Sequence, residues 1–263
     1  MLLQIHWNVH PEIWPDVLPV RWYGLLFMSG FVFGYYILER IFKHENKGLP
    51  LLDSLSLYVG AGTILGARLG HCLFYEPAYY LANPLEILKV WEGGLASHGA
   101  VVGILLANYL YGRKFRNTGF FWVTDRLVIV VALAAVMIRL GNLMNSEIVG
   151  APTTVAWAFI FDRLGDGIPR HPSQLYEAGF YLITFMVLYR LYWKAAAGKY
   201  AGRLFGYFLL MVFGFRFLIE FIKDVQVDFE KSMALNMGQW LSLPLVLIGL
   251  FLIWNSHRKS AKA

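Results

Sequence analysis

The fold of this chain is decided by the stretch Arg139-Leu-Gly-Asn-Leu-Met-Asn-Ser-Glu-Ile-Val-Gly150, which directly follows an apolar run from Leu127 to Ile138. The run must lie in a bilayer or a deep core. The next twelve residues then bring one arginine, two asparagines, one glutamate and two glycines. An arginine at the centre of a membrane costs roughly 2.5–3.5 kcal/mol or more. We therefore expect Arg139 to be paired.

Three polar side chains of this stretch share one face if the helix continues through it. Arg139, Asn142 and Asn145 are spaced by three residues, and residues at that spacing are neighbours on a helix surface. Gly141 and Gly150 permit close approach of other groups or unusual backbone angles. The arrangement predicts an anion-binding corner at a membrane surface. The alternative is a helix-end arginine that extends its charged end to the interface.

Composition indicates a membrane protein. Of 263 residues, 58% are hydrophobic and 15% are charged, with a mean hydropathy of +0.52, whereas a soluble domain carries about 25% charged residues. The aromatic share of 17% suits interfacial belts of Trp and Tyr. The net charge of +6 could suggest nucleic acid, but the distribution of charge matters more than its sum in a membrane protein. We expect no nucleic-acid partner.

Cys72 is the only cysteine, so the chain has no internal disulfide and no multi-cysteine metal site. No basic group obviously activates its thiol, and we interpret it as a small packing residue. The first twenty residues contain no Lys or Arg and no cleavage site, which predicts that no signal peptide is removed.

Seven apolar stretches predict an all-α polytopic membrane protein with seven transmembrane helices in a single domain, residues 1–263. Each stretch is near the ~20 residues that a helix needs to cross a bilayer. The stretches cover residues 21–39, 53–73, 95–111, 121–140, 174–193, 204–222 and 238–254.

Lysine and arginine concentrate in alternate connections, after the first, third, fifth and seventh stretches. Because such residues are enriched in cytoplasmic loops, we expect a cytoplasmic C-terminus and an external N-terminus. The long connection 141–173 is expected to be an external head insert, in which the alternating pattern of Val155 to Phe161 predicts a short strand. Residues 1–20 and 74–94 are predicted to lie along the interface as arms.

Ionisable and polar residues in or beside the stretches map almost entirely to the external half. Asp125 and Arg126, at the cytoplasmic end of the fourth stretch, are the exception. Polar side chains that only extend to the membrane surface would occur at both ends of the spans. The clustering at one end therefore predicts a site that opens toward the outer leaflet. Its members are Arg21, Tyr23, Arg68, His71, His98, Arg139, Glu147, His171, Glu177, Arg216 and Glu220.

Arg216 and Glu220 are four residues apart in the sixth stretch. One interpretation is a self-neutralising pair that lets the helix sit in lipid. The other makes Arg216 a second phosphate ligand beside Arg139, oriented by Glu220. Arginine suits that role because its planar fork meets phosphate oxygens bidentately.

Two histidines stand in motifs near span ends. His98 lies in the glycine-flanked sequence Gly93-Gly-Leu-Ala-Ser-His-Gly99 and is either structural or a general base or substrate positioner. His171 opens the sequence His171-Pro-Ser-Gln-Leu-Tyr-Glu177. There we expect Ser173 to be an N-cap and Glu177 to lie in the first turn against the helix dipole. Those roles do not account for His171, Gln174 and Tyr176 together.

Motifs of several enzyme classes are absent from the sequence, namely HExxH, GxSxG, Walker A and paired CxxC. Redox and ATP-driven chemistry therefore lack support.

The motifs, taken in order, resemble those of the prolipoprotein diacylglyceryl transferases. The stretch from Arg139 to Gly150 is similar to the signature Gly-Arg-x-Gly-Asn-aromatic-x-Asn-x-Glu-x-x-Gly of that family. Five further motifs look like that family in the same order: Arg21-Trp-Tyr-Gly24, Gly94-Leu-Ala-Ser-His-Gly99, His171-Pro-Ser-Gln-Leu-Tyr-Glu177, Arg216-Phe-Leu-Ile-Glu220 and Met237-Gly-Gln-Trp-Leu-Ser242. The resemblance covers most of the chain.

Three positions depart from the family pattern. Ile138 stands where glycine is usual and Leu143 where an aromatic is usual, and both changes are expected to affect packing. Val212 stands where a tyrosine often precedes the arginine motif, so a hydroxyl near Arg216 is lost.

The resemblance implies an enzyme of the bacterial inner membrane with its N-terminus and active site toward the periplasm. It would transfer the diacylglyceryl group of phosphatidylglycerol to the thiol of the lipobox cysteine in a prolipoprotein signal peptide. The product is a thioether, and glycerol 1-phosphate leaves. No metal or soluble cofactor is required.

The chemistry that the resemblance implies needs cations on the departing phosphate and a base for the thiol. We expect Arg139 and Arg216 to bind phosphate and His98 to be the base. Glu147 and Glu220 are expected to orient the arginines. The candidates for positioning the head group and binding substrate are Tyr23, Asn142, Asn145, Gly150, His171, Gln174 and Tyr176.

Two other classes of protein compete with this interpretation. A transporter or flippase for an anionic lipid could use the same arginines, but it should line both halves of the membrane with polar residues. The cytoplasmic halves here are almost purely apolar. An intramembrane hydrolase is weakened by the missing Ser/His or Asp/Asp motif.

Overall fold

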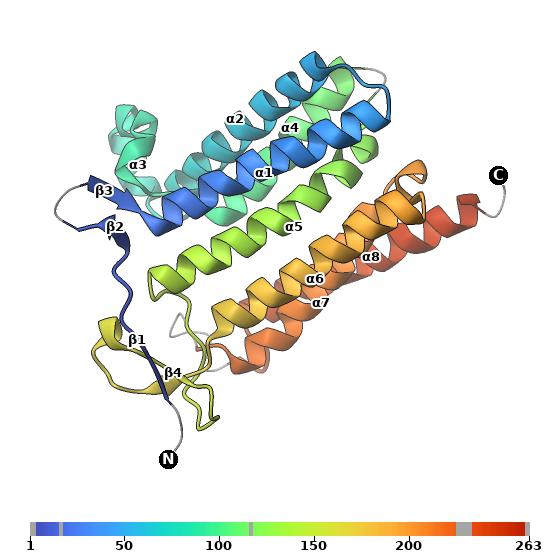
Figure 1. The fold of residues 1–263 in the computed structure, drawn as a ribbon. Coiled ribbons are helices and arrows are strands. Elements are labelled where there is room, and N and C mark those ends of the chain that lie inside the picture. The colour runs from blue at the N-terminus through green and yellow to red at the C-terminus, as the bar shows by residue number, and fades with distance from the viewer. Residues whose placement is uncertain (1–3, 16–17, 116–117, 225–232, 261–263) are drawn as a thin grey trace. The chain divides into compact units, whose positions relative to one another are not determined.

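The structure is a computed structural model that describes residues 4–15, 18–115, 118–224 and 233–260. The chain folds mainly as helices (Figure 1). It divides into two compact units, of which the larger contains Met1–Ile37 and Asp125–Ala263 and the smaller contains Leu38–Thr124.

Each predicted apolar stretch lies entirely or almost entirely within helical structure. The helices are longer than the stretches at most ends, because polar residues can extend a helix beyond an apolar layer. The long helices are α1 (Trp22–His44), α2 (Leu49–Phe74), α4 (Ser97–Lys114), α5 (Phe120–Met144), α6 (Ser173–Lys194), α7 (Arg203–Ile219) and α8 (Met237–Ser260).

Five helical segments among the described residues are long and apolar enough to cross a membrane. They are Trp22–His44, Leu49–Phe74, Phe120–Met144, Arg203–Ile222 and Met237–Lys259. Helices α4 and α6 are more polar and fall short of that criterion, so a count of seven spans stays a prediction.

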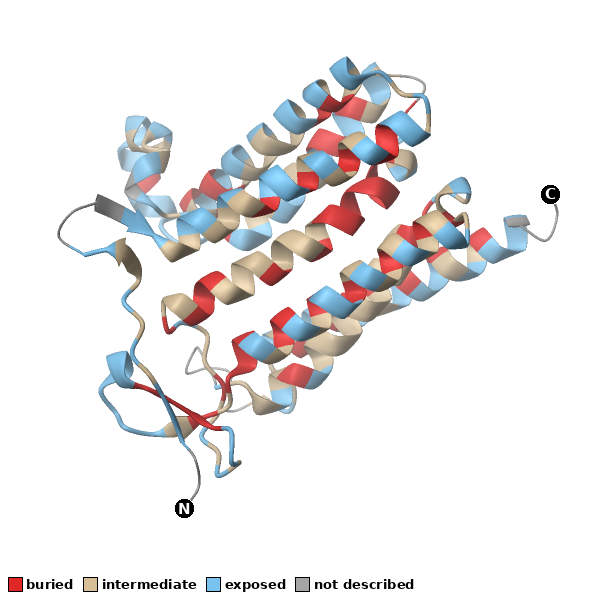
Figure 2. Ribbon diagram, in the orientation of Figure 1, coloured by how far each residue is buried: buried red, intermediate tan, exposed pale blue. Residues whose placement is uncertain are grey.

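Large apolar side chains face outward on these helices, and Figure 2 shows exposed residues recurring along α1, α2 and α8. Leu57, Phe74 and Leu247 are 74%, 83% and 66% exposed. Soluble monomers rarely expose apolar surface on this scale. The chain is therefore an integral membrane protein.

In the smaller unit, α2 and α4 approach closely through glycines. A Cβ on Gly103 of α4 would collide with the carbonyl oxygen of Gly62, and one on Gly66 of α2 would collide with that of Gly99. Small residues at such positions let helix backbones pack against each other in membranes. Cys72 is buried in α2 as a free thiol, which agrees with the packing role predicted for it.

The predicted interfacial arm at 74–94 is made of short helices in the same unit: α3 (Pro77–Ala82), η1 (Pro84–Leu88) and η2 (Val90–Glu92). Arg68 of α2 is buried beneath them. Its guanidinium donates to the carbonyl oxygens of Ile87 at 2.9 Å, Glu86 at 2.5 Å and Gly93 at 2.7 Å. Arg68, one of the polar residues that sequence grouped into a site, therefore anchors this segment.

In the larger unit, α5, α6 and α7 share a core of Val136, Ala178, Tyr181 and Val212. Helix α7 begins after Gly202, which has no side chain to cap it. Asp125 of α5 caps it instead, because its two carboxylate oxygens accept the backbone N–H groups of Gly202 at 2.7 Å and Phe205 at 2.8 Å.

Two small sheets correct the expectation of an all-α protein. The first has the order β1 (Ile5–Trp7), β4 (Phe159–Phe161), β5 (Pro169–Arg170), and the second pairs β2 (Glu12–Trp14) with β3 (Leu18–Arg21). Strand β1 runs parallel to β4, so the N-terminal segment becomes part of the 141–173 insert rather than an independent arm.

The strand predicted over Val155 to Phe161 is shorter than expected. Strand β4 covers only Phe159–Phe161, and all three residues are buried instead of alternating. Phe159 and Phe161 form a buried cluster with Leu143, against which Trp7 and Val149 pack. The indole N–H of Trp7 also donates to the carbonyl oxygen of Leu143 at 2.9 Å, which ties the insert to the end of α5.

Candidate active site

Arg139, in the last turns of α5, is paired as predicted but with an unexpected partner. Its Nε lies 3.1 Å from Oε2 of Glu177 in α6, and the Glu177 side chain is fully buried. Its Nη1 donates to Oδ1 of Asn142 at 3.2 Å. The prediction that Glu177 serves the dipole of its own helix is wrong, since Glu177 lies beyond the first turn and faces Arg139.

Glu147, the predicted partner of Arg139, contacts the asparagines instead. Its carboxylate accepts hydrogen bonds from Nδ2 of Asn142 at 3.4 Å and from Nδ2 of Asn145 at 3.1 Å. The prediction that it pairs with Arg139 is wrong because the chain turns away after Met144. Among the described residues, Asn142 links Glu147 to Arg139.

The loop after α5 has strained backbone on both sides of Glu147. Ser146 and Ile148 have φ of 55° and 54°, a left-handed conformation that is an outlier for a β-branched residue and costs on the order of 1–3 kcal/mol per residue. The loop is held by α6, because Gln174 Nε2 donates to the carbonyl oxygen of Glu147 at 2.7 Å and Ser173 Oγ donates to that of Ile148 at 2.8 Å.

These contacts correct two expectations. Ser173 is not the N-cap of α6, since the helix begins at Ser173 itself and Pro172 occupies the cap. Its hydroxyl holds the loop instead. Helix α5 ends at Met144, so Asn145 lies beyond the face that carries Arg139 and Asn142.

The second predicted arginine, Arg216 of α7, has its expected partner at longer range. Its Nε is 3.7 Å from Oε1 of Glu220, which begins the short helix η5 (Glu220–Ile222). Glu220 also accepts a hydrogen bond from Nδ2 of Asn236 at 3.1 Å. Gly238 leaves room for this carboxylate, since a Cβ there would lie 2.6 Å from it.

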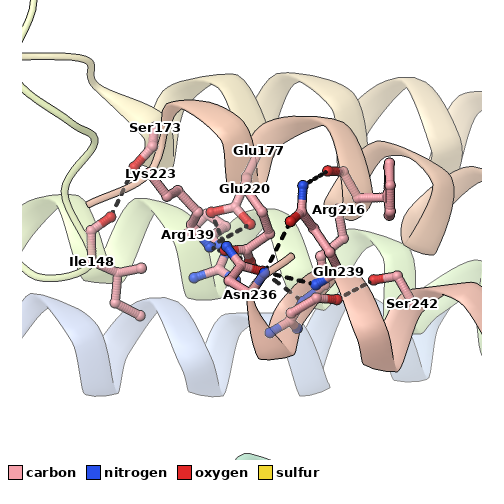
Figure 3. Close-up of polar contacts among 12 residues, drawn as sticks. Arg139, Ile148, Ser173, Glu177, Arg216, Glu220, Lys223, Asn236, Gln239 and Ser242 are labelled. Carbon is pink, nitrogen blue, oxygen red and sulfur yellow. Dashed lines mark hydrogen bonds and ion pairs between the residues drawn. The ribbon is translucent and has the colours of Figure 1, made fainter. Parts of the chain in front are cut away.

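Lys223 joins the two arginine pairs. Its Nζ is 3.5 Å from Oε1 of Glu177 and 3.3 Å from Oε1 of Glu220, with a side chain 6% exposed. We call Arg139, Glu177, Lys223, Glu220 and Arg216 the charge network. Figure 3 shows that these side chains converge from α5, from α6, and from α7 and the segment that follows α7. Lys223 is not among the site residues predicted from the sequence, although its spacing of three from Glu220 was a usable signal.

Tyr181 adds a hydroxyl to the charge network. The hydroxyl is 3.4 Å from Oε1 of Glu177, whose Oε2 pairs with Arg139. Tyr181 packs against Val212 in one buried core cluster. A tyrosine hydroxyl is thus present beside the pair of Glu177 and Arg139, although position 212 is a valine.

Gly150, at the end of the signature stretch, permits a close backbone crossing. Its N–H donates to the carbonyl oxygen of His171 at 3.0 Å, and it forms an isolated bridge with Lys223. A Cβ on Gly150 would lie 2.5 Å from that oxygen of His171. The predicted need for close approach is confirmed, and the group approached is backbone.

His171 and Tyr176 contact each other and the head insert. Nδ1 of His171 lies 3.2 Å from the hydroxyl of Tyr176, which accepts a hydrogen bond from the indole N–H of Trp157 at 2.7 Å. None of the contacts of either side chain reaches the charge network among the described residues, so their part in substrate binding stays a prediction.

A cavity of about 500 Å³ lies beside the signature stretch and is lined by Arg21, Tyr23, Gly24 and Asn145 among others. Tyr23 packs on Gly141, where a Cβ would lie 2.8 Å from its ring. The buried Oδ1 of Asn145 has no hydrogen-bond partner among the described residues. The cavity thus joins two residues predicted to position a head group.

His98 belongs to the smaller unit. It lies in the first turn of α4, is exposed, and lines a cavity of about 480 Å³ together with His71, Tyr75 and Ser97. Its role as a base stays a prediction, because the charge network lies in the larger unit.

The fold and the charge network define a helical membrane protein with ionised side chains clustered inside its helical unit, and such side chains within membrane segments mark functional sites. The family model described as prolipoprotein diacylglyceryl transferase matches residues 12–255. The chain therefore belongs to the prolipoprotein diacylglyceryl transferase family, as its motifs predict, and is a transferase.

Individual relatives agree along almost the whole chain. The phosphatidylglycerol–prolipoprotein diacylglyceryl transferase of Chloroherpeton thalassium is 49% identical over 257 residues, which cover 97% of this chain and 96% of that protein. The protein of the same name from Tolumonas auensis is 46% identical over 98% of this chain and 100% of that protein. The one from Bacteroides fragilis is 43% identical, with coverage of 100% and 99%.

Proposed function

We propose that this protein transfers the diacylglyceryl group of phosphatidylglycerol to the cysteine thiol of a prolipoprotein lipobox. The thiolate sulfur attacks the glyceryl carbon that carries the phosphate, and a C–S bond forms as the C–O bond to phosphate breaks. The electron pair of that bond leaves with glycerol 1-phosphate, and the thiol proton goes to a base. The product is a thioether, which begins lipoprotein maturation.

The observation that carries this proposal is the charge network. Arg139 and Arg216 both contact carboxylates through Nε, and Nη1 of Arg139 donates to Asn142. In this proposal Nη2 of Arg139 and the Nη groups of Arg216 donate to the phosphate. Pre-oriented cations stabilise the charge that develops on a departing phosphate, and they do so more strongly where water is largely excluded. A displacement at an sp³ carbon needs this stabilisation of the leaving group.

Other residues serve the substrates in this proposal. Tyr23 and Asn145 face the head group from their shared cavity, Asn142 presents its amide beside Arg139, and Glu147 orients both asparagines. His98 takes the proton of the thiol. Gly150, His171, Gln174 and Tyr176 support the site by holding the loop and the head insert.

We place the protein in the bacterial inner membrane with seven spans, adding α4 and α6 to the five apolar segments. The N-terminus, the head insert and the active site face the periplasm, and the C-terminus lies in the cytoplasm. Phosphatidylglycerol then enters sideways from the bilayer, where the signal peptide with its lipobox also lies.

The test is to incubate purified protein with phosphatidylglycerol and a lipobox peptide and to measure peptide mass. We expect the mass of the diacylglyceryl adduct. The matched control is the same peptide with serine in place of cysteine, which should stay unmodified because it lacks the thiol. Folded protein that gives no adduct with either peptide would contradict the proposal.

A further inference from the structure

Lys223 is shared between the two carboxylates that pair with the arginines. Its Nζ lies 3.3 Å from Oε1 of Glu220, whereas the Nε of Arg216 lies 3.7 Å from the same oxygen. A lysine buried to this extent is costly unless it is paired. The two contacts therefore stabilise the lysine, and they also draw one oxygen of each carboxylate toward it.

The backbone at Lys223 is fixed from both sides. Before it, the carbonyl oxygen of Ile222 accepts the N–H of Ala151 at 2.9 Å, and Lys223 itself bridges to Gly150. After it, Asp224 accepts a hydrogen bond from Nη1 of Arg170 at 2.6 Å. The lysine thus enters the network from a position set by the signature stretch and the head insert.

The charge of the network depends on Lys223. Three cations face two carboxylates, so the formal charge is 3 − 2 = +1. Without the lysine it would be 2 − 2 = 0. Each carboxylate would then be free to close bidentately on its own arginine, the strongest geometry for such a pair, and would occupy the donors that a phosphate needs.

We propose that Lys223 is a positioning residue of the phosphate site, which holds Glu177 and Glu220 back from Arg139 and Arg216 and keeps the network positively charged. This inference rests on the proposed function and deepens it. Lys223 acts through the carboxylates and does not touch the reacting atoms. Its role is electrostatic, so a charge change elsewhere in the network compensates for its loss.

The test compares four variants of the full chain, each assayed per folded molecule at saturating phosphatidylglycerol. Lys223→Met should lower kcat by at least about 30-fold, the smallest loss expected when one partner of a buried charge pair is removed. Lys223→Arg keeps the charge and should lose less than about tenfold. The control is Lys199→Met, an exposed lysine of η4 (Ala197–Lys199), which should behave as wild type.

The fourth variant separates charge from packing. Lys223→Met combined with Glu220→Gln has two arginines and one carboxylate, so the formal charge returns to 2 − 1 = +1. The glutamine oxygen can still accept the hydrogen bond of Asn236. Its kcat should exceed that of Lys223→Met by at least about fivefold, a coupling typical of residues in one network.

Each outcome decides something different. Near-normal turnover of Lys223→Met overturns the inference. The inference is also overturned if Lys223→Met is impaired, Lys223→Arg is equally impaired, and the added Glu220→Gln substitution restores no activity, because that pattern indicates a purely structural role. If wild type itself makes no adduct, the proposed function fails. In that case, the amount of radiolabelled phosphatidylglycerol that the same variants retain tests the role of Lys223. If the inference is correct, Lys223→Met retains at least about tenfold less lipid than Lys223→Arg.

Discussion

The Nε atom of Arg139 lies 3.1 Å from Oε2 of Glu177, and this ion pair joins the end of α5 to α6. The two residues come from different motifs of the sequence. Their pairing gives a buried guanidinium a counter-ion at Nε, while its Nη1 donates to Asn142. The charge network, and through it the second arginine, extends from this contact.

Removal of either arginine should abolish measurable transfer. Loss of one charge-assisted partner at a shielded site costs about 2–5 kcal/mol, on the order of 30-fold to several thousandfold in rate. We expect this loss of transfer for Arg139→Ala and Arg216→Ala. The corresponding lysine variants keep the charge but lose the bidentate guanidinium, so they should retain at most a small fraction of the activity. The measurement is adduct formed per folded molecule at saturating phosphatidylglycerol. Near-normal turnover in an alanine variant would leave that arginine as a structural partner only.

The two glutamates near Arg139 should differ in their effect on stability. Glu177→Gln leaves a buried guanidinium without its counter-ion, which costs about 3–5 kcal/mol. Glu147 is exposed, and Glu147→Gln keeps the shape of its side chain, so we expect a change within about 1 kcal/mol. Thermal unfolding of both variants in the same detergent gives the comparison. Equal shifts of the melting temperature would mean that the Glu177 pair is not an important stabilising contact.

His98→Gln tests the proposed base. If His98 takes the thiol proton, the rate should fall by roughly 10²–10⁴, while binding of phosphatidylglycerol changes little. The assay is kcat with the lipobox peptide, alongside retention of labelled lipid. His71→Gln is the matched control, because His71 lines the same cavity and has no assigned part in proton transfer. A loss below about tenfold for His98→Gln would assign the proton to another group.

Asp166 should make stability depend on acid pH. Its pKa is lowered chiefly because its carboxylate accepts the backbone N–H of Ile168, with a further hydrogen bond from Arg170. A carboxyl whose pKa is lower in the folded state stabilises that state above the unfolded pKa of about 3.9, and the effect is lost as pH falls through the folded pKa. The melting temperature of wild type should therefore fall more steeply between about pH 5 and pH 3 than that of Asp166→Asn. Parallel curves would contradict this account.

Much of the helical structure could be predicted from local sequence. An apolar run of about 20 residues in lipid must satisfy its backbone hydrogen bonds internally, so each predicted stretch became a helix. The cost of a charge in an apolar run also predicts that Arg139 and Arg216 are paired. For Arg216 and Glu220 even the partner could be predicted, because residues four apart on a helix face each other.

The partner of Arg139 was decided only by tertiary structure. Glu147 is nearer along the chain, but the left-handed residues Ser146 and Ile148 turn the loop, and Gln174 holds it so that Glu147 meets the asparagines. The pairing of β1 with β4 and the contact of Lys223 with Glu177 could not be predicted from sequence patterns either. Ion pairs and strand partners depend on distances between segments remote in sequence, and periodicity along one segment carries no information about those distances.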